Sequence, residues 1–227
     1  MDIVDFHSHI LPEADHGSSS VEESLKQLNL ALKRGVTRIV ATPHFYPHKH
    51  NLKSFFERRD KSVKDLSDAS FPGMPEIVVG AEILLCQNIN KISSLHSLAI
   101  GSSNKLLVEL PFGDFEQWQL DTVRNLESDG YKVVLAHADR YPRKNIERFL
   151  EYGIKLQLNA YSLTRLFARK HLFRWVKEGH VVALGSDIHG TSERYYKKFN
   201  AAKVRLGDDV NLIKESSDRM WSEFKNI

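Results

Sequence analysis

The strongest constraint on how this chain can fold is an alternation of seven short runs of β-branched and aliphatic residues with stretches of helical pattern. Short apolar runs bounded by turn residues are typical of buried strands, and the stretches between them supply crossover helices. Strands that alternate with helices predict a parallel sheet. The predicted strands are residues 3–6, 37–41, 77–79, 106–110, 133–136, 156–158 and 181–184.

The helical stretches carry their own start and stop signals. Ser20 followed three residues later by Glu23 is a capping box at the start of a helix over residues 21–33. Residues 211–224 predict a further helix at the end of the chain. Glycine closes four helical stretches shortly before a strand begins, as expected for the left-handed helix stop. These glycines are Gly35, Gly130, Gly153 and Gly179.

Length and composition fit one globular domain over residues 1–227. The chain is 41% hydrophobic and 27% charged, a balance that allows a large buried core. An odd number of strands, nearly all followed by ligand-type side chains, favours a closed or nearly closed α/β barrel over an open sheet. In such a barrel the functional site lies at the carboxyl ends of the strands.

Other features bear on location and partners. No window approaches 18 consecutive apolar residues, so we expect no membrane-spanning helix. Residues 1–5 carry acids where a signal peptide carries positive charge, and the single cysteine, Cys86, excludes an internal disulfide framework. We therefore expect a cytoplasmic protein. The net charge is only +3 and the basic residues are scattered, so we expect no nucleic-acid partner.

Ligand-type side chains follow six of the seven predicted strands. The carboxyl ends of barrel strands meet at one mouth, so these side chains are expected to converge. The sixth strand, which ends at Asn159, lacks a strong ligand. The candidates are His7 and His9 after the first strand, His44 after the second, Glu82 after the third, Glu109 after the fourth, His137 after the fifth, and Asp187 and His189 after the seventh.

The spacing of these residues supports a metal centre. Side chains two positions apart on a strand share a face, so His7 aims the same way as His9, and Asp187 the same way as His189. Imidazole and carboxylate without thiolate form the ligand set of zinc, iron or manganese. The candidates exceed the needs of one ion, which predicts a polynuclear centre. Glu82 is a candidate bridge between two ions roughly 3.5–4 Å apart.

Covalent routes to hydrolysis lack their motifs. Cys86 is followed six residues later by Ile92, where a cysteine phosphatase needs an arginine. The chain has no Gly-x-Ser-x-Gly elbow and no glycine-rich nucleotide fingerprint. A metal-activated water is the remaining nucleophile.

Taken in order, the segments that follow the strands resemble those of the polymerase-and-histidinol-phosphatase (PHP) superfamily. Within it the chain is most similar to the bacterial manganese-dependent protein-tyrosine phosphatases of capsule and exopolysaccharide operons. The resemblance runs from Asp5 to about Arg194. It rests on His7-Ser8-His9-Ile10-Leu11-Pro12, Glu22-Glu23-Ser24, Ala41-Thr42-Pro43-His44, Gly80-Ala81-Glu82, Glu109-Leu110-Pro111-Phe112, Ala136-His137-Ala138-Asp139-Arg140-Tyr141 and Ser186-Asp187-Ile188-His189.

The resemblance implies a distorted (β/α)7 TIM-like barrel of the PHP type, with up to three metal ions at the carboxyl ends of the strands. Manganese is the implied metal, with iron or zinc as alternatives. By matching position, the implied ligands are His7, His9, Glu82 and Asp187 for the first ion, Glu82, Glu109 and His137 for the second, and His16, His44 and His189 for the third.

One of these ligands departs from the family pattern. The family has an Asp-Asp-Gly segment whose second aspartate binds the third ion, whereas this chain has Asp15-His16-Gly17. Histidine can still bind a metal, but a neutral imidazole makes the site one charge less negative. We expect His16 to remain a ligand.

The resemblance also implies how phosphate is recognised. Arg140 and Arg194 match arginines that bind substrate in the family. Planar guanidinium groups can hold phosphate oxygens bidentately and offset charge that develops during transfer. The implied reaction is in-line attack on phosphorus by a metal-bound hydroxide.

The substrate that the resemblance implies is a phosphotyrosine-containing protein, with the tyrosine-rich tail of a bacterial tyrosine autokinase of polysaccharide synthesis as the candidate. Aromatic residues near the mouth, Tyr161 among them, are candidates to flank the substrate ring. Two alternatives stay open. One is a small-molecule phosphatase acting on a compound such as histidinol phosphate; the other is a non-catalytic metal-binding regulator that holds a phosphopeptide. An oligomer is compatible with the sequence.

Overall fold

The computed structural model describes residues 3–165 and 170–224, and it places nine parallel strands in one sheet. The strands follow the order β3-β5-β6-β7-β8-β9-β1-β2-β4. Each pair of neighbouring strands in this sheet is parallel, as the alternation of strands and helices predicts. The strands are β1 (Asp5–Ser8), β2 (Arg38–Ala41), β3 (His44–Phe45), β4 (Glu76–Val79), β5 (Glu82–Leu84), β6 (Lys105–Glu109), β7 (Lys132–Leu135), β8 (Lys155–Asn159) and β9 (Val181–Gly185).

The nine strands make seven passes of the chain, because β2 continues into β3 and β4 continues into β5. Only Thr42 and Pro43 separate the first pair, and proline supplies no N–H for a continuous ladder. Gly80 and Ala81 separate the second pair. A Cβ atom at Gly80 would lie 2.9 Å from the side chain of Ile100, so this break needs glycine. The seven predicted strands are therefore confirmed, and the two breaks are additions to them.

The sheet curls back on itself, so that its two terminal strands come from neighbouring passes. β2 pairs with β4, and β3 pairs with β5 with His44 opposite Glu82. The result is a distorted TIM-like α/β barrel, which confirms the predicted fold class. The broken passes carry His44 and Glu82 to the carboxyl edge of the sheet.

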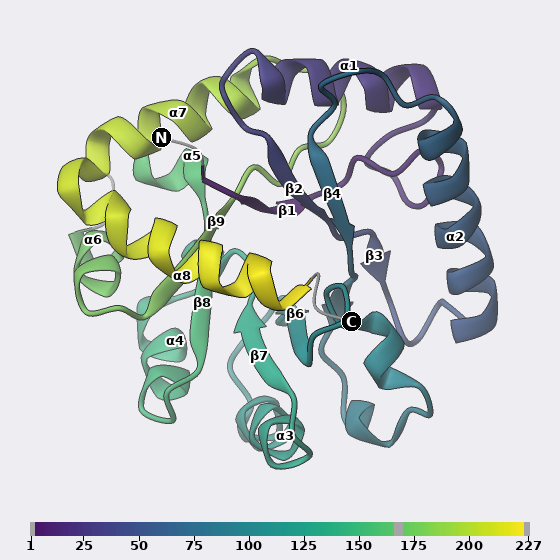
Figure 1. Cartoon of the computed structure of the whole chain (residues 1–227). Coiled ribbons are helices and arrows are strands. Elements are labelled where there is room, and N and C mark those ends of the chain that lie inside the picture. The colour runs from purple at the N-terminus through teal and green to yellow at the C-terminus, as the bar shows by residue number, and fades with distance from the viewer. Residues whose placement is uncertain (1–2, 166–169, 225–227) are drawn as a thin grey trace.

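Helices cover the outside of the curled sheet (Figure 1). The largest hydrophobic cluster lies between the strands and these helices and includes Leu28, Phe149 and Trp175. The helices are α1 (Val21–Leu32), α2 (Leu52–Asp68), α3 (Gln117–Ser128), α4 (Arg143–Leu150), α5 (Ala160–Leu163), α6 (Lys170–Lys177), α7 (Arg194–Leu206) and α8 (Val210–Phe224), with short 3-10 turns η1 (Ile89–Lys91), η2 (Leu95–Leu98), η3 (Ala138–Arg140) and η4 (Gly207–Asp209).

The last helix, α8, has a different position from the others. It crosses the sheet in Figure 1, and Met220, Trp221 and Phe224 join a second hydrophobic cluster made of strand side chains. The rings of Phe6 and Phe224 lie 5.8 Å apart. The predicted tail helix is confirmed, and it fills space against the strand residues that the outer helices do not reach.

The helix boundaries follow the predicted signals. The Ser20 hydroxyl accepts a hydrogen bond from the backbone N–H of Glu23. The Glu23 carboxylate accepts from the N–H of Ser19 at 2.7 Å, one residue earlier than a strict capping box requires. The four helix-closing glycines have positive φ angles between 71° and 93°, which confirms the left-handed stop.

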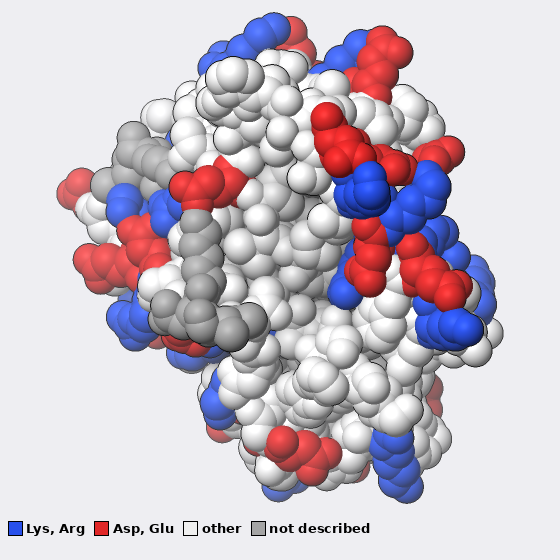
Figure 2. Space-filling view, turned by 45° about the vertical axis from the view of Figure 1, so that its right-hand side comes forward, with Lys and Arg blue, Asp and Glu red and all other residues white. Residues whose placement is uncertain are grey.

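Charged residues of both signs are mixed on the surface. Figure 2 shows acidic and basic side chains side by side on the face that it draws. On α2, lysine pairs with a carboxylate one turn on at Lys61–Asp65 and Lys64–Asp68. Among the described residues, no helix is both long enough and apolar enough to cross a membrane.

Candidate metal centre

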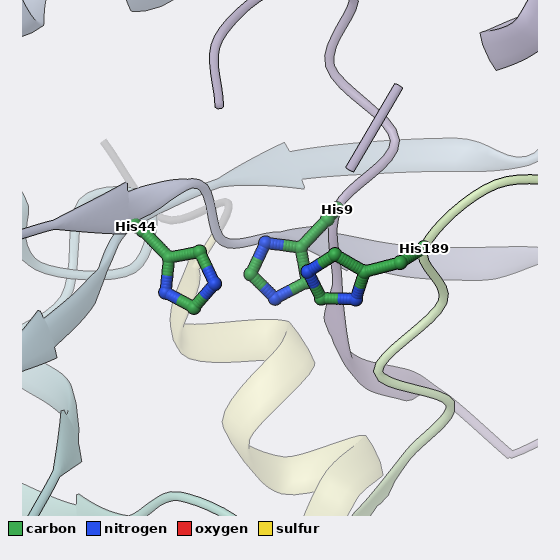
Figure 3. Close-up of side chains that lie close together, drawn as sticks. All are labelled: His9, His44 and His189. Carbon is green, nitrogen blue, oxygen red and sulfur yellow. The ribbon is translucent and has the colours of Figure 1, made fainter. Parts of the chain in front are cut away.

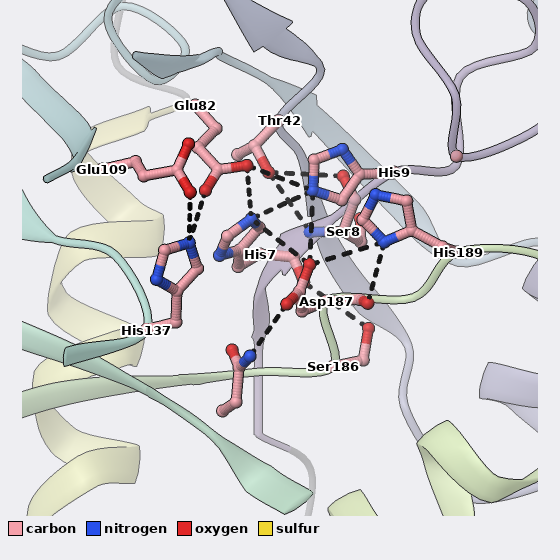
Figure 4. Close-up of polar contacts among 12 residues, drawn as sticks. His7, Ser8, His9, Thr42, Glu82, Glu109, His137, Ser186, Asp187 and His189 are labelled. Atoms are coloured by element: carbon pink, nitrogen blue, oxygen red, sulfur yellow. Dashed lines mark hydrogen bonds and ion pairs between the residues drawn. The ribbon is translucent and has the colours of Figure 1, made fainter. Parts of the chain in front are cut away.

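The predicted ligands from six of the seven chain passes meet at the carboxyl edge of the sheet, and Figure 4 labels those of every pass except the second, which contributes His44. Nearly all of these side chains are buried; His189, with 26% of its side chain exposed, is the most open. The structure therefore confirms that these side chains lie close together. Figure 4 draws together His7, His9, Glu82, Glu109, His137, Asp187 and His189, and His44 joins them at 2.9 Å from Glu82.

His7 and His9 are two residues apart along the first pass, and both direct the Nε2 atom of the ring into the cluster. Their Nε2 atoms lie 3.1 Å apart. One carboxylate oxygen of Glu82 lies 3.1 Å from Nε2 of His7 and 3.3 Å from Nε2 of His9. This group of three can hold one cation, as their common spacing within 4.8 Å indicates.

Glu82 faces two groups of ligands with its two oxygens. Its Oε2 atom also lies 2.9 Å from Nδ1 of His44, while Oε1 lies 2.7 Å from Nε2 of His137. Glu109 approaches the same nitrogen of His137 at 3.4 Å. A carboxylate with one oxygen directed to each of two ligand groups has the arrangement of a bridge between two ions.

Asp187 completes the side of the cluster next to β9. Its Oδ1 atom lies 3.5 Å from Nε2 of His9 and 3.5 Å from Nδ1 of His189. Its Oδ2 atom accepts a hydrogen bond from the Asn159 amide at 2.8 Å and pairs with the guanidinium of Arg140. The backbone of Asp187 is left-handed, with φ of 51°, so it leaves the strand direction. Asp187 and His189 do lie close together, as predicted. The predicted reason, a shared face of one strand, is wrong because the chain has left the strand at Asp187.

A third group consists of imidazole rings. His9, His44 and His189 point into one space (Figure 3), and their ligand atoms satisfy the same 4.8 Å spacing. The ring of His16 stacks on that of His44, with centroids 4.8 Å apart and planes 7° from parallel, and it lies 4.7 Å from His189. The structure thus places His16 beside this group, at its exposed rim.

Lone pairs in the cluster are left without hydrogen-bond donors. Within the described ranges, the buried side-chain atoms without a hydrogen-bond partner include Nδ1 of His44, Oε2 of Glu82 and Nε2 of His189. Buried polar atoms are costly unless they are satisfied. Nitrogen and carboxylate donors turned inward without hydrogens suit divalent cations, so the residues present fit a metal centre.

The charges of the cluster support the same interpretation. Burial alone would raise the pKa of Glu82, but the charge of His7 and hydrogen bonds from neighbouring imidazoles hold it well below the usual range. Burial would lower the pKa of His137, but hydrogen bonds to Glu109 and Glu82 raise it to about 9. The metal-free protein therefore keeps Glu82 ionised and holds a proton on His137. Cation binding is expected to release such protons.

A second layer of side chains fixes the ligands, and the sequence did not reveal it. The Asp15 carboxylate accepts from Nδ1 of His9 at 2.7 Å and from the N–H of His44 at 2.9 Å. The Gln157 carbonyl oxygen accepts from Nδ1 of His7 at 3.1 Å and from the N–H of His137 at 2.7 Å. These bonds leave Nε2 of His7, on β1, and Nε2 of His9, just after β1, to act as ligands to a metal.

The sixth pass thus contributes support although it carries no strong ligand. Gln157 and Asn159 alternate on β8, and their side chains are joined by a 3.1 Å hydrogen bond. Gln157 holds His7 and Asn159 holds Asp187. The signal available in the sequence was this same alternation of polar residues at a strand end.

Asp5 is fully buried at the start of β1 and ties this strand to the segment that carries Asp187. Its Oδ1 atom accepts from the N–H of Ser186 at 2.8 Å, and Oδ2 accepts from the Tyr196 hydroxyl at 2.9 Å. Burial raises the pKa of Asp5 to about 6, and the hydrogen bonds from Ser186 and Tyr196 only partly offset that effect.

The raised pKa of Asp5 predicts a pH-dependent stability in the metal-free protein. The folded state binds this proton more tightly than the unfolded state, in which the pKa of an aspartate is near its ordinary value of 3.8. The contribution of Asp5 to stability is therefore present at acid pH and is lost as pH rises through about 6. Relative to Asp5→Asn, the free energy of unfolding of the wild type should fall by about 2 kcal/mol between about pH 4.5 and about pH 7.

Urea unfolding of both proteins in chelator measures this difference. Asp208→Asn changes an exposed carboxylate in η4, the turn after α7, and controls for the change in net charge. Parallel stability curves for the wild type and Asp5→Asn would show that Asp5 does not carry the proton.

A cavity of about 390 Å³ opens beside the metal-ligand cluster. Both predicted phosphate-binding arginines line it: Arg140 from η3, paired with Asp187, and Arg194 from the start of α7. Lys198, one helical turn after Arg194, lines the same cavity and was not predicted. The remaining lining residues are Asn159, Tyr161, Ser186, Asp187, His189 and Tyr195.

Comparison with known proteins agrees with this geometry. The chain is 25% identical over 213 residues to the tyrosine-protein phosphatase YwqE of Bacillus subtilis, covering 89% of this chain and 83% of YwqE. It is 29% identical over 217 residues to the putative tyrosine-protein phosphatase CapC of Staphylococcus aureus, covering 89% of this chain and 84% of CapC. The tyrosine-protein phosphatase CpsB of Streptococcus pneumoniae is 26% identical, with 85% of each chain covered.

A solved structure shares the fold. It belongs to work on YwqE from Bacillus subtilis and CpsB from Streptococcus pneumoniae, described as unique metal-dependent tyrosine phosphatases. It superposes with a TM-score of 0.78 at 22% identity, covering 99% of this chain and 95% of that one. The family model for capsular polysaccharide synthesis, CpsB/CapC, matches residues 3–208. Because that match spans most of the sequence, the chain belongs to the CpsB/CapC family.

Proposed function

We propose that this chain is a metal-dependent protein-tyrosine phosphatase. The observation that carries the proposal is the position of Glu82, whose two oxygens face two groups of imidazole ligands. The cavity next to this cluster is lined by Arg140 and Arg194. A polynuclear metal centre beside two guanidinium groups suits hydrolysis of a phosphate monoester.

The assignment of ligands follows the three groups of side chains. His7, His9, Glu82 and Asp187 would hold one ion, and Glu109 and His137 would hold a second together with Glu82. His16, His44 and His189 would hold a third. Manganese is the proposed metal because carboxylates take part in the first two sites, with iron or zinc as alternatives.

When bound, the divalent ions supply a water that is activated at neutral pH and positive charge for the phosphoryl oxygens. The side chains of the protein do the positioning. Arg140 and Arg194 would bind the phosphate from the cavity side, since neither guanidinium is buried and both line the cavity. Asp15 and Gln157 keep the rings of His9 and His7 in their orientation through Nδ1.

The proposed substrate is the phosphotyrosine of a bacterial tyrosine kinase of polysaccharide synthesis, as the activity named for the relatives suggests. The cavity suits such a segment because Tyr161 leaves 52% of its surface exposed at the cavity wall. The single cysteine is consistent with the cytoplasmic location that access to such a kinase requires.

Elemental analysis combined with phosphate release from a phosphotyrosine peptide tests the proposal. We expect about two or three metal ions per chain and hydrolysis that a chelator abolishes and Mn²⁺ restores. A third ion that is present in the wild type and missing in His16→Ala would support His16 as a ligand, and its retention would contradict that assignment.

Two other results would count against the proposal. Bound metal without hydrolysis of the peptide would contradict the substrate class and turn attention to small phosphate esters. A protein that takes up no metal after incubation with Mn²⁺, Fe²⁺ or Zn²⁺ would contradict the metal centre itself.

A further inference from the structure

The wall of the cavity that faces away from the metal ligands is built by α5 and α7. Tyr161 comes from α5, and Arg194, Tyr195 and Lys198 come from α7. These two helices follow β8 and β9, the strands next to Asp187. When the phosphate of a substrate lies at the metal ligands, this wall would therefore contact the residues of the peptide next to the phosphotyrosine.

The cavity lining carries more positive charge than the phosphate-binding role accounts for. Its cations are Arg140, Arg194 and Lys198, and its single carboxylate is Asp187, which pairs with Arg140. Among the described residues, no ion pair within 4 Å joins Lys198 to a carboxylate. Lys197, the next residue back, instead pairs with Glu193 at 2.7 Å.

Lys198 lies half-buried along an aromatic ring rather than in solvent. Its Nζ atom is 5.7 Å from the centroid of the Tyr161 ring, and the Arg165 guanidinium approaches that ring at 5.8 Å. An exposed ring flanked by cations can pack against an aromatic substrate while the cations remain available to an anion.

The spacing on α7 sets the distance between Arg194 and Lys198. Arg194 and Lys198 are four residues apart, so they share a face of the helix about 6 Å apart along its axis. An extended peptide advances roughly 3.3 Å per residue. A phosphate near Arg194 therefore leaves Lys198 beside a side chain within about two residues of the phosphotyrosine.

We propose that Lys198 selects phosphotyrosine substrates that carry an aspartate or glutamate within two residues of the phosphotyrosine. The proposal rests on the proposed phosphatase function, because it assumes that the phosphate enters this cavity. Lys198 acts as a specificity residue: it binds a carboxylate of the peptide and takes no part in the reaction at phosphorus.

Charge reversal at one position tests the proposal. Three peptides that differ only next to the phosphotyrosine, with aspartate, asparagine or lysine, are compared with p-nitrophenyl phosphate, which lacks a second charge. The wild type should favour the aspartate peptide over the lysine peptide by roughly three- to tenfold in kcat/KM, carried by KM, as expected for a partly exposed ion pair. Lys198→Glu should invert that order.

Lys197→Glu is the matched control, since it makes the same charge change on the same helix outside the cavity. It should keep the order of the wild type. A wild type that hydrolyses all three peptides equally, or a Lys198→Glu variant with an unchanged order, would overturn the role of Lys198. A wild type that hydrolyses neither the peptides nor p-nitrophenyl phosphate would instead contradict the phosphatase function.

Discussion

Glu82→Gln is expected to lose the metal ions that its two oxygens would bridge and to lower phosphate release about a thousandfold or more. The side chain is almost completely buried, and its oxygens lie within 3.3 Å of nitrogen atoms of four histidines. Glutamine has nearly the same volume, so packing is preserved. It replaces an ionised oxygen with an NH2 group, which cannot bind a cation and would face imidazole nitrogen atoms instead.

The metal content per chain after reconstitution with Mn²⁺ measures the effect directly. Glu109→Gln provides a graded comparison, because Glu109 forms an ion pair only with His137, at 3.4 Å, whereas Glu82 lies that close to four histidines. It should lose fewer ions than Glu82→Gln. Glu22→Gln, on the exposed face of α1 beside Lys26, should behave as the wild type. A Glu82→Gln protein that retains both metal and activity would refute the bridging role.

The main outline of this site could be predicted because it depends on topology rather than on detail. Parallel strands in one sheet end at the same edge, so residues after six strands had to meet once the strands were recognised. The stops at Gly35 and Gly130 could be predicted for a similar reason, since the left-handed backbone that ends these helices favours glycine.

The breaks within two passes could not be predicted because they depend on contacts between distant segments. Pro43 interrupts the second pass, and the packing of Gly80 against Ile100 shows why the third pass is interrupted. The position of α8 is also tertiary. Its apolar residues predict an amphipathic helix, and no local pattern says that Phe224 meets Phe6.

The residues that support the ligands escaped prediction for a chemical reason. Asp15 and Gln157 are ordinary polar residues, and their role comes from holding Nδ1 of a histidine far along the chain or in a neighbouring loop. Lys198 is one of many basic residues in the chain. Only its place one turn after Arg194, in the same cavity, distinguishes it.

Asp187→Ala is expected to remove both bound metal and hydrolysis, since it deletes the carboxylate that closes the first ligand group. The same change leaves the guanidinium of Arg140 and the amide of Asn159 without their common partner. It also puts alanine at φ of 51°, where the left-handed backbone adds a cost of about 1 kcal/mol. A loss of activity in this variant alone would therefore not distinguish the loss of a metal ligand from the strain of the backbone.

Asp187→Asn separates the two effects. Asparagine tolerates the left-handed backbone and can still accept the hydrogen bond from Asn159, so the loop around Asp187 should keep its form and the melting temperature should stay near that of the wild type. It lacks the negative charge that a cation at His7 and His9 requires. If Asp187 is a ligand, the two variants lose metal and activity together, roughly a thousandfold, and differ only in stability. If Asp187→Asn stays active with its full metal content, Asp187 is not a metal ligand and its role is to hold the loop in place. Another residue must then bind the first ion together with His7, His9 and Glu82.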